Sequence, residues 1–343
     1  MSQKFDDITN FILRHVREYP SEVTRMAVDH FGISRQAVNR YMKYLVKEGV
    51  LSESGNTRSR KYTINPILNE YWDLNVKENQ EEDRVWRNLL KPYTTNLPKN
   101  IQEICQYGFT EIYNNVIDHS ESQTAVISLT IYPDWIRITV KDNGVGIFNK
   151  IQSHFNLDDP MHAILELSKG KLSTDPGRHS GEGIFFTSRM FDTFSIVSSH
   201  LIFCHSKEGG MDALFEEKEF SAGTTVVMET SLFSSATTEE IFNEYSINGG
   251  FGFDRTVIPV FLGGYGDENL VSRSQARRLL ARINRFKLIV FDFNKVEMIG
   301  QAFADEIFRV YANENPAIKL MYVNVNKKVE GMIKRVIDAR IGD

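Results

Sequence analysis

The chain has 343 residues, 41% of them hydrophobic and 25% charged, and 40 Lys+Arg against 45 Asp+Glu give a formal net charge of −5. This composition is that of a globular protein, and at about 100 to 200 residues per domain it predicts two or three domains. Its two cysteines exclude a disulfide framework and a cysteine-based zinc site, and its first residues lack the apolar stretch of a signal peptide. No apolar run is long enough to cross a bilayer, so we expect a cytoplasmic protein without a membrane partner.

The charge is unevenly distributed, because residues 1–66 hold 11 Lys+Arg and 7 Asp+Glu while the remainder carries −9. Within this basic head, the apolar spacing predicts helices over 5–16, 23–31 and 35–48 and a hairpin over 50–64. A helix that follows a glycine-containing turn and has basic residues on one side fits the recognition helix of a helix-turn-helix. The candidate DNA-binding residues are Arg35, Gln36, Asn39, Arg40 and Lys43 on this helix and Arg58, Arg60 and Lys61 at the hairpin tip.

The head resembles the winged-helix DNA-binding family in the stretch HFGISRQAVNRYMKYLVKEGVL, where Ser34 is expected to cap the third helix. The resemblance implies that this helix reads duplex DNA and that the hairpin is a wing in contact with phosphates. A protein-docking module and an ordinary solvated helix face are the alternatives. DNA binding predicts an affinity that falls steeply with salt, because phosphate neutralisation releases counterions.

Residues 67–100 are polar and mostly helical in character, and we interpret them as a helical connector that packs through Trp72 and Trp86. From 101 to 233, long helices alternate with period-two strands, which predicts a mixed α/β layer domain. The expected strands are 124–131, 135–141, 194–198, 201–205 and 224–230.

The expected helix over 101–119 carries a polar stripe. At 100° per residue, Glu111, Asn115 and Asp118 lie within about 60° of one another on a helix whose other face is apolar. A solvated face and a functional site both explain such a stripe. His119 follows directly, and we interpret it as a structural histidine rather than as a phosphorylated one.

Two glycine-rich turns follow the stripe along the chain. The first, KDNGVG, ends an expected strand, and the second, GRHSGEG, opens an expected helix. Glycine lets the backbone approach a ligand closely, and the N–H groups at a helix N-terminus suit phosphates. The residues of this series are Asp142, Gly144 and Gly146, then Gly181 and Gly183, then Gly223 and Thr224 on a late strand.

This order of motifs resembles the GHKL ATPase superfamily, whose Bergerat α/β sandwich is shared by gyrase-type ATPases, histidine kinases and anti-sigma-factor kinases. The resemblance covers about residues 101–232 and implies that the chain binds ATP and Mg²⁺. It implies that Asn115 holds the Mg²⁺, that Glu111 is the general base for an attacking water, and that Asp142 accepts the adenine amino hydrogen. The other cofactor-binding candidates, which the stripe and the resemblance place around the nucleotide, are Asp118, Gly144, Gly146, Gly181, Gly183 and Thr224.

The resemblance also implies a lid over the nucleotide, formed by residues 147–180. Its basic residues Lys169, Lys171 and Arg178 either reach the γ-phosphate or are simply exposed. Phe185 departs from the family pattern, because a glycine or another small residue is expected there.

The tail from 250 to 343 alternates apolar strands with helices and contains LIVFDFNKVEMIGQAFADEIF. This arrangement is similar to the STAS domains of anti-sigma-factor antagonists, in which a serine after the strand is phosphorylated. The corresponding residues here, Gly300 to Phe303, include no hydroxyl, so the tail is expected to be a docking or regulatory module.

Together these predictions describe an α/β multidomain chain with a winged helix-turn-helix over 1–66, a connector over 67–100, a Bergerat α/β sandwich over 101–233 and a STAS-like α/β domain over 250–343. The favoured function is a transcriptional regulator, as a monomer or a homodimer, that couples Mg-ATP binding or hydrolysis to DNA binding. An anti-sigma-like Ser/Thr protein kinase that acts on a protein partner is the alternative, and a clamp-like ATPase is the third.

Overall fold

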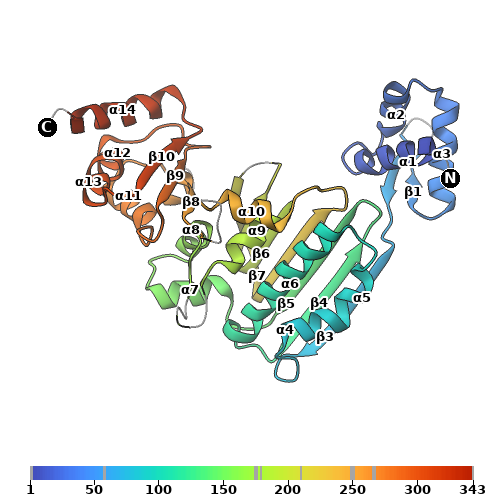
Figure 1. Cartoon of the computed structure of the whole chain (residues 1–343), viewed down its shortest axis with the longest axis horizontal. Helices are drawn as coiled ribbons and strands as arrows, with labels where there is room; N and C mark the ends of the chain where they lie inside the picture. The colour runs from blue at the N-terminus through green and yellow to red at the C-terminus, as the bar shows by residue number, and fades with distance from the viewer. Residues whose placement is uncertain are drawn as a thin grey trace.

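The computed structural model describes residues 3–56, 59–173, 177, 180–208, 211–247, 252–264 and 268–341. It has an N-terminal unit, a central sheet covered by helices and a C-terminal unit, and the two terminal units lie toward opposite ends of the central one (Figure 1).

The N-terminal unit contains the three helices and the hairpin that the apolar spacing predicts. The elements are α1 (Gln3–Val16), α2 (Val23–Phe31), α3 (Arg35–Lys47) and the antiparallel strands β1 (Leu51–Ser54) and β2 (Lys61–Ile64). The N–H of Ala37 donates to Ser34 Oγ at 3.2 Å, which confirms the predicted cap of α3. These elements enclose an apolar core of their own, centred on Ile12, Val38 and Leu45.

The central sheet has five antiparallel strands in the order β3-β4-β5-β7-β6. The strands are β3 (Leu68–Asn75), β4 (Thr124–Ile131), β5 (Trp135–Asp142), β6 (Thr193–Ser206) and β7 (Met211–Ser231). The separate strands expected over 194–198 and 201–205 are one strand, β6, interrupted by an irregularity between Val197 and Leu201.

The expected helical character of residues 67–100 is wrong at its start, because β3 forms the edge of the central sheet. Leu68 and Trp72 pack on the core while Tyr71 is exposed, so one face of this strand is half-buried and the other faces solvent. Polar residues on both faces make the period-two hydrophobic pattern hard to recognise in the sequence. The rest of the segment is helical in α4 (Glu82–Val85), η1 (Trp86–Leu90) and α5 (Lys91–Thr94).

Helices cover one face of the sheet. The long α6 (Lys99–His119) crosses it, and α9 (Gly183–Met190) packs beside α6 (Figure 1). Between β5 and β6 the chain also forms α7 (Ile147–Phe155) and α8 (Met161–Lys169), and after β7 it forms α10 (Thr238–Glu244). The capping box of α10, Thr237 with Glu240, is present.

The C-terminal unit is an α/β layer on a parallel sheet of order β10-β9-β8. Its strands and helices alternate as predicted, and its core is continuous with that of the central unit. The elements are β8 (Arg255–Pro259), η2 (Val260–Gly263), α11 (Arg273–Leu280), β9 (Leu288–Asp292), α12 (Gln301–Asp305), η3 (Glu306–Tyr311), α13 (Ala312–Glu314), β10 (Lys319–Val323) and α14 (Lys327–Ile341).

Candidate functional site

A pocket of about 300 Å³ lies between α6, the end of β5, the neighbouring part of β7 around Thr224, and residues of the segment from α7 to α9. This volume is at the lower end of the range for small-molecule sites. The lining combines apolar side chains with carboxylate, amide, hydroxyl and glycine positions. The predicted site residues in the lining are Glu111, Asn115, Asp142, Gly146, Gly181, Gly183 and Thr224.

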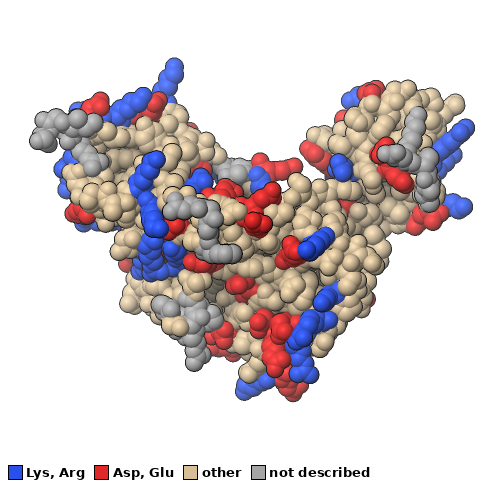
Figure 2. Space-filling model, in the orientation of Figure 1, with Lys and Arg blue, Asp and Glu red and all other residues tan. Residues whose placement is uncertain are grey.

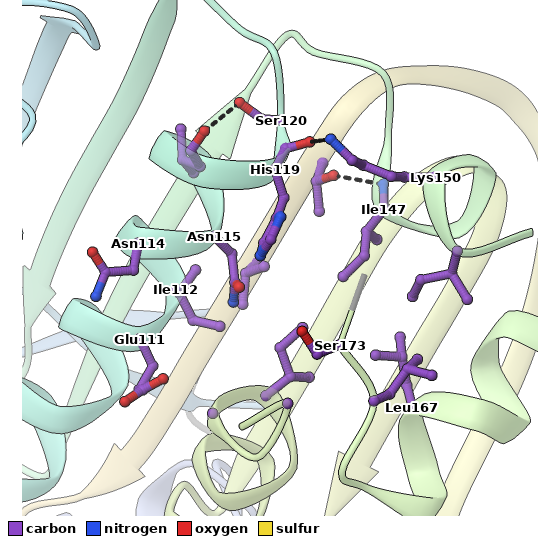
Figure 3. Close-up of a pocket in the computed structure, with 18 of the residues that line it drawn as sticks. Glu111, Ile112, Asn114, Asn115, His119, Ser120, Ile147, Lys150, Leu167 and Ser173 are labelled. Carbon is purple, nitrogen blue, oxygen red and sulfur yellow. Dashed lines mark hydrogen bonds between the residues drawn. The ribbon is translucent and has the colours of Figure 1, made fainter. Parts of the chain in front are cut away.

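The stripe on α6 reaches this pocket with Glu111, Asn115 and His119, which are four residues apart and therefore on one side of the helix. Asn115 and His119 project from α6 toward Ile147 (Figure 3). Asp118, the third residue of the stripe, is exposed and outside the lining.

Asp142, the last residue of β5, is a buried carboxylate held by backbone donors. Its Oδ1 accepts from the N–H of Gly144 at 2.8 Å and from the N–H of Thr224 at 3.3 Å. Burial raises the pKa of Asp142, and these hydrogen bonds act in the opposite direction. Gly144 is outside the lining but contributes through this bond, while Thr224 Oγ1 accepts from the N–H of Ile147 at 3.0 Å.

Gly183 opens α9 directly against Glu111. A Cβ added at Gly183 would lie 2.0 Å from Glu111 Oε2, so a larger residue here would displace this carboxylate from the helix N-terminus. A helix N-terminus favours negative charge, because its first N–H groups have no partner within the helix. The site therefore brings an acidic side chain and an anion-binding backbone together at one point.

Several lining residues were not predicted as ligands, among them Asn114, Ser120, Lys150 and Ser173. Lys150 Nζ donates to the carbonyl of His119 at 2.6 Å and to Glu121 Oε1 at 3.1 Å (Figure 3). This contact joins α7 to the end of α6. His119 follows Asn115 by four residues, as Asn115 follows Glu111. Helical spacing therefore places His119 on the same side of α6, and this is the sequence signal that indicates it as a lining residue.

Lys169 and Lys171, the lid lysines considered as γ-phosphate contacts, do not line the pocket, whereas Lys150 of the same segment does. Lys169 is buried rather than exposed, and its Nζ donates to carbonyls of the C-terminal unit. Lys171 Nζ donates to the carbonyl of Arg285 at 3.3 Å. The remaining lid cation, Arg178, lies outside the described residues.

A divalent cation in the pocket would find hard oxygen donors on Glu111 and Asn115, one helical turn apart. In the described part of the chain, no three His, Cys, Asp or Glu side chains gather as a metal site. This donor set suits Mg²⁺, which is commonly held by one or two protein groups together with waters and substrate phosphates. The residues present therefore fit a cation that arrives with an anionic ligand.

The described candidate DNA-binding residues lie on α3 and in the hairpin, at Arg60 and at the start of β2. Arg35, Gln36, Arg40 and Lys43 are exposed on α3, and Asn39 is half-buried. Two further residues follow in the hairpin: Lys61 is exposed, and Arg60 is paired with Glu53 at 3.4 Å. Arg58 is outside the described residues. Basic side chains gather along the outer edge of this unit (Figure 2).

The N-terminal unit touches the central one through α1. Arg17 makes a two-pronged ion pair with Asp134, with N–O distances of 3.1 and 3.2 Å, and Asp134 is buried. The guanidinium of Arg14 lies 4.4 Å from the centre of the Phe233 ring. These contacts fall in the β4–β5 turn and just after β7.

A second, more open cavity of about 540 Å³ lies between the central and C-terminal units. Its wall includes Arg189, which donates to both oxygens of Asp212 at 2.8 and 3.1 Å, and His205, whose Nδ1 lies 2.8 Å from Asp212. Burial alone would raise the pKa of Asp212, but Arg189 and His205 outweigh it and hold that pKa well below its ordinary value. Burial and Arg189 lower the pKa of His205. Arg189, His205 and Asp212 are one another's partners, so their burial does not require a ligand in this cavity.

The comparisons with known proteins concern the C-terminal unit. Residues 275–330 match a family model described as a STAS-like domain of unknown function (DUF4325). The chain contains a STAS-like domain. The match runs from within α11 into α14 and includes the parallel strands β9 and β10, while β8 precedes it. No curated protein matches the chain at a significant level.

The expected Gly300 to Phe303 loop of this STAS-like domain starts α12. Gly300 is the N-cap residue, and a Cβ placed there would lie 2.8 Å from the Cα of Val271. None of the helices in the described ranges is long and apolar enough to span a membrane.

Proposed function

We propose that the chain is an ATP-binding regulator whose central unit is a GHKL-type domain and whose N-terminal unit is a winged helix that binds duplex DNA. One observation carries the proposal. Four separate segments, spread over more than 100 residues of the chain, line a single pocket with Glu111 and Asn115, Asp142, Gly181 with Gly183, and Thr224.

The lining suits the two ends of ATP. Asp142 lies among Val140, Ile151 and Val226, where a carboxylate oxygen can accept from the adenine amino group in apolar surroundings. The phosphates would lie against the glycine turn that opens α9, where backbone N–H groups supply positive potential. Bound Mg²⁺ would neutralise charge on the phosphates.

Asn115 would hold the cation through its amide oxygen. Glu111 would orient an attacking water and take its proton, provided that the carboxylate stays where Gly183 leaves room for it. These roles make Asn115 necessary for Mg-dependent affinity and Glu111 necessary for hydrolysis. The two can therefore be separated by mutation.

The DNA-binding role rests on the exposed basic and polar residues of α3. Arg and Lys on such a face bind phosphates, and Gln and Asn can read base edges. The half-buried Asn39 and the Glu53-paired Arg60 are less available than Arg35, Arg40 and Lys43.

The coupling between the two sites would run through β5. This strand starts at Trp135, beside the Arg17–Asp134 ion pair, and ends at Asp142 in the pocket. A change in the position of its pocket end can thus reach the contact with α1. ATP alters DNA binding only if it binds the two states of this contact with different affinity.

Titration calorimetry with Mg-ATP tests the pocket assignment. The wild-type chain is expected to bind, and Asn115→Ala is expected to weaken Mg-dependent binding at least about tenfold, because a lost hydrogen bond or ligand to a charged group is worth about 1.5–3 kcal/mol. Undiminished affinity in this variant would refute the metal role of Asn115.

A Ser/Thr protein kinase is the second candidate, favoured by the STAS-like domain beside the pocket. Its acceptor would be a separate protein, because Gly300 and Gln301 offer no hydroxyl. ATP labelled at the γ-phosphate separates the functions. Label transferred to protein supports a kinase, and label released as phosphate supports an ATPase. If neither transfer nor release is seen, the chain acts as a binding switch.

A further inference from the structure

The segment from Leu167 to Ser173 has two sides. Leu167, Leu172 and Ser173 line the pocket, while Lys169 and Lys171, between them in sequence, contact the C-terminal unit. The same few residues therefore form a pocket wall and a domain interface. A shift of one side has to move the other.

Lys169 is the centre of this interface. Its Nζ donates to Glu166 Oε1 at 2.8 Å, to the carbonyl of Arg278 at 2.8 Å and to the carbonyl of Ala281 at 3.0 Å, and the side chain is 2% exposed. The two carbonyls belong to the end of α11, where that of Arg278 also accepts from the N–H of Ala281 at 3.4 Å. An ammonium group placed there satisfies these acceptors and complements the negative end of the helix dipole.

Further contacts fix the same segment. Thr256 Oγ1 donates to the carbonyl of Lys169 at 2.7 Å, and Arg282 pairs with Glu166 at 3.3 Å. Gly170 has a φ of +77°, and a Cβ added there would lie 2.6 Å from the ring of Phe253. The C-terminal unit thus meets this segment through backbone, charged and aromatic groups.

Separation of the two units would be costly for Lys169. Burial lowers its pKa, and its charge is compensated by three acceptors, two of which belong to the C-terminal unit. Without those carbonyls the ammonium group would have to reach water, because an isolated buried charge is very unfavourable. The end of α8 would then move, and Leu167 and Leu172 would move with it.

We propose that the STAS-like domain is an internal latch on the pocket: when it is docked on Lys169, it holds residues 167–173 in the position that lines the ligand. The identity of that ligand, Mg-ATP, rests on the function proposed above. Because coupling between sites is reciprocal, nucleotide in the pocket strengthens docking of the STAS-like domain by the same factor. A signal that loosens this domain therefore lowers nucleotide affinity.

The test uses the full chain and three variants. Lys169→Met removes the ammonium group but keeps an apolar stem of similar length, and Glu166 retains Arg282 as its partner. Arg282→Gln is a milder, partly exposed change at the same interface. The matched control is Arg277→Gln, on the same helix α11, where the arginine is 68% exposed and pairs with Glu306 inside the STAS-like domain.

Two quantities are measured for each protein: the Mg-ATP dissociation constant by calorimetry, and hydrogen exchange of peptides over 161–173 and 273–286 with and without nucleotide. The latch predicts affinity about 5- to 150-fold weaker in Lys169→Met, the span typical of coupled sites. It also predicts a smaller loss in Arg282→Gln and no loss in Arg277→Gln. Exchange over both peptides is expected to rise in Lys169→Met and to fall in the wild type when nucleotide binds.

The outcomes separate this inference from the function on which it rests. A wild-type chain that binds Mg-ATP, with Lys169→Met and Arg282→Gln binding equally tightly, overturns the latch and leaves the proposed function standing. A wild-type chain that binds no nucleotide overturns both. A melting curve for each variant shows whether the fold is retained, and Arg282→Gln decides the question if Lys169→Met does not fold.

Discussion

Replacing Asp142 by Asn changes one atom of the pocket and tests which hydrogen-bond partner the ligand offers. The carboxylate is 3% exposed, and Oδ1 accepts from the N–H groups of Gly144 and Thr224. Asn can keep both bonds with its own oxygen, and its Nδ2 then takes the place of the second carboxylate oxygen. Since burial raises the pKa of Asp142, the neutral amide also escapes a desolvation penalty, and we expect the melting temperature to change little.

The ligand, in contrast, loses an ionised acceptor and meets a donor. A hydrogen bond to a charged group is worth about 1.5–3 kcal/mol, so Asp142→Asn is expected to weaken ATP binding about 10- to 150-fold. Inosine triphosphate carries an oxygen where ATP carries the amino group, and the new amide can donate to that oxygen. The ratio of ATP to inosine triphosphate affinity is therefore expected to fall, and to approach inversion, in the variant.

Competition titrations with the two nucleotides measure this ratio, and Asp118→Asn is the matched control. Asp118 is a carboxylate of the same stripe that is exposed and outside the pocket lining, so its ratio is expected to equal that of the wild type. Equal ratios in the wild type and in Asp142→Asn would show that Asp142 does not contact the base. An effect of Asp118→Asn as large as that of Asp142→Asn would contradict the described position of the pocket.

Three further predictions concern the structure around the site. Gly223→Ala is expected to lower the free energy of unfolding by more than about 1–2 kcal/mol, because φ is +69° and the new Cβ would lie 2.1 Å from a backbone oxygen. Gly331→Ala, on α14 with open space around the new Cβ, is expected to raise it by about 0.5–1 kcal/mol. A denaturant titration that finds Gly223→Ala the more stable of the two variants would contradict this reasoning. Arg17→Gln removes the ion pair with Asp134, so proteolysis between the N-terminal and central units is expected to accelerate; an unchanged cleavage rate would show that the pair does not hold them together. Asp212→Asn is expected to cost about 3–5 kcal/mol at neutral pH. Because the folded pKa of Asp212 is depressed, its contribution is present above the ordinary value of 3.8 and is lost as the pH falls below it, so melting curves of the two proteins should converge in acid.

The elements with strong local signals could be predicted from the sequence. Ser34 caps α3 as expected, and the glycine turns near Gly146 and Gly183 open α7 and α9. Glu111 and Asn115 could be paired by helical spacing alone. Each of these depends on neighbours within a few residues, so the local sequence contains the necessary information.

Other features depend on partners far along the chain. Whether Asp118 or His119 faces the pocket depends on where α7 and α9 pack against α6, which helical spacing does not contain. The polar neighbours of Tyr71 make β3 hard to recognise from the sequence, because it pairs with β4, which begins at Thr124. The local sequence does not distinguish Lys169 from an exposed lysine, because the two carbonyls that accept from its ammonium group lie at the end of α11, about 110 residues later.

The most direct test of the proposed regulator is the DNA affinity of the full chain, measured by titration at fixed salt with and without saturating Mg-ATP. Mg-ATP is expected to change this affinity at least about fivefold, the lower end of typical coupling between sites. The change is expected to disappear in Asn115→Ala, whose N-terminal unit is intact. An affinity ratio of one in the wild type would refute coupling between the nucleotide pocket and the DNA-binding unit.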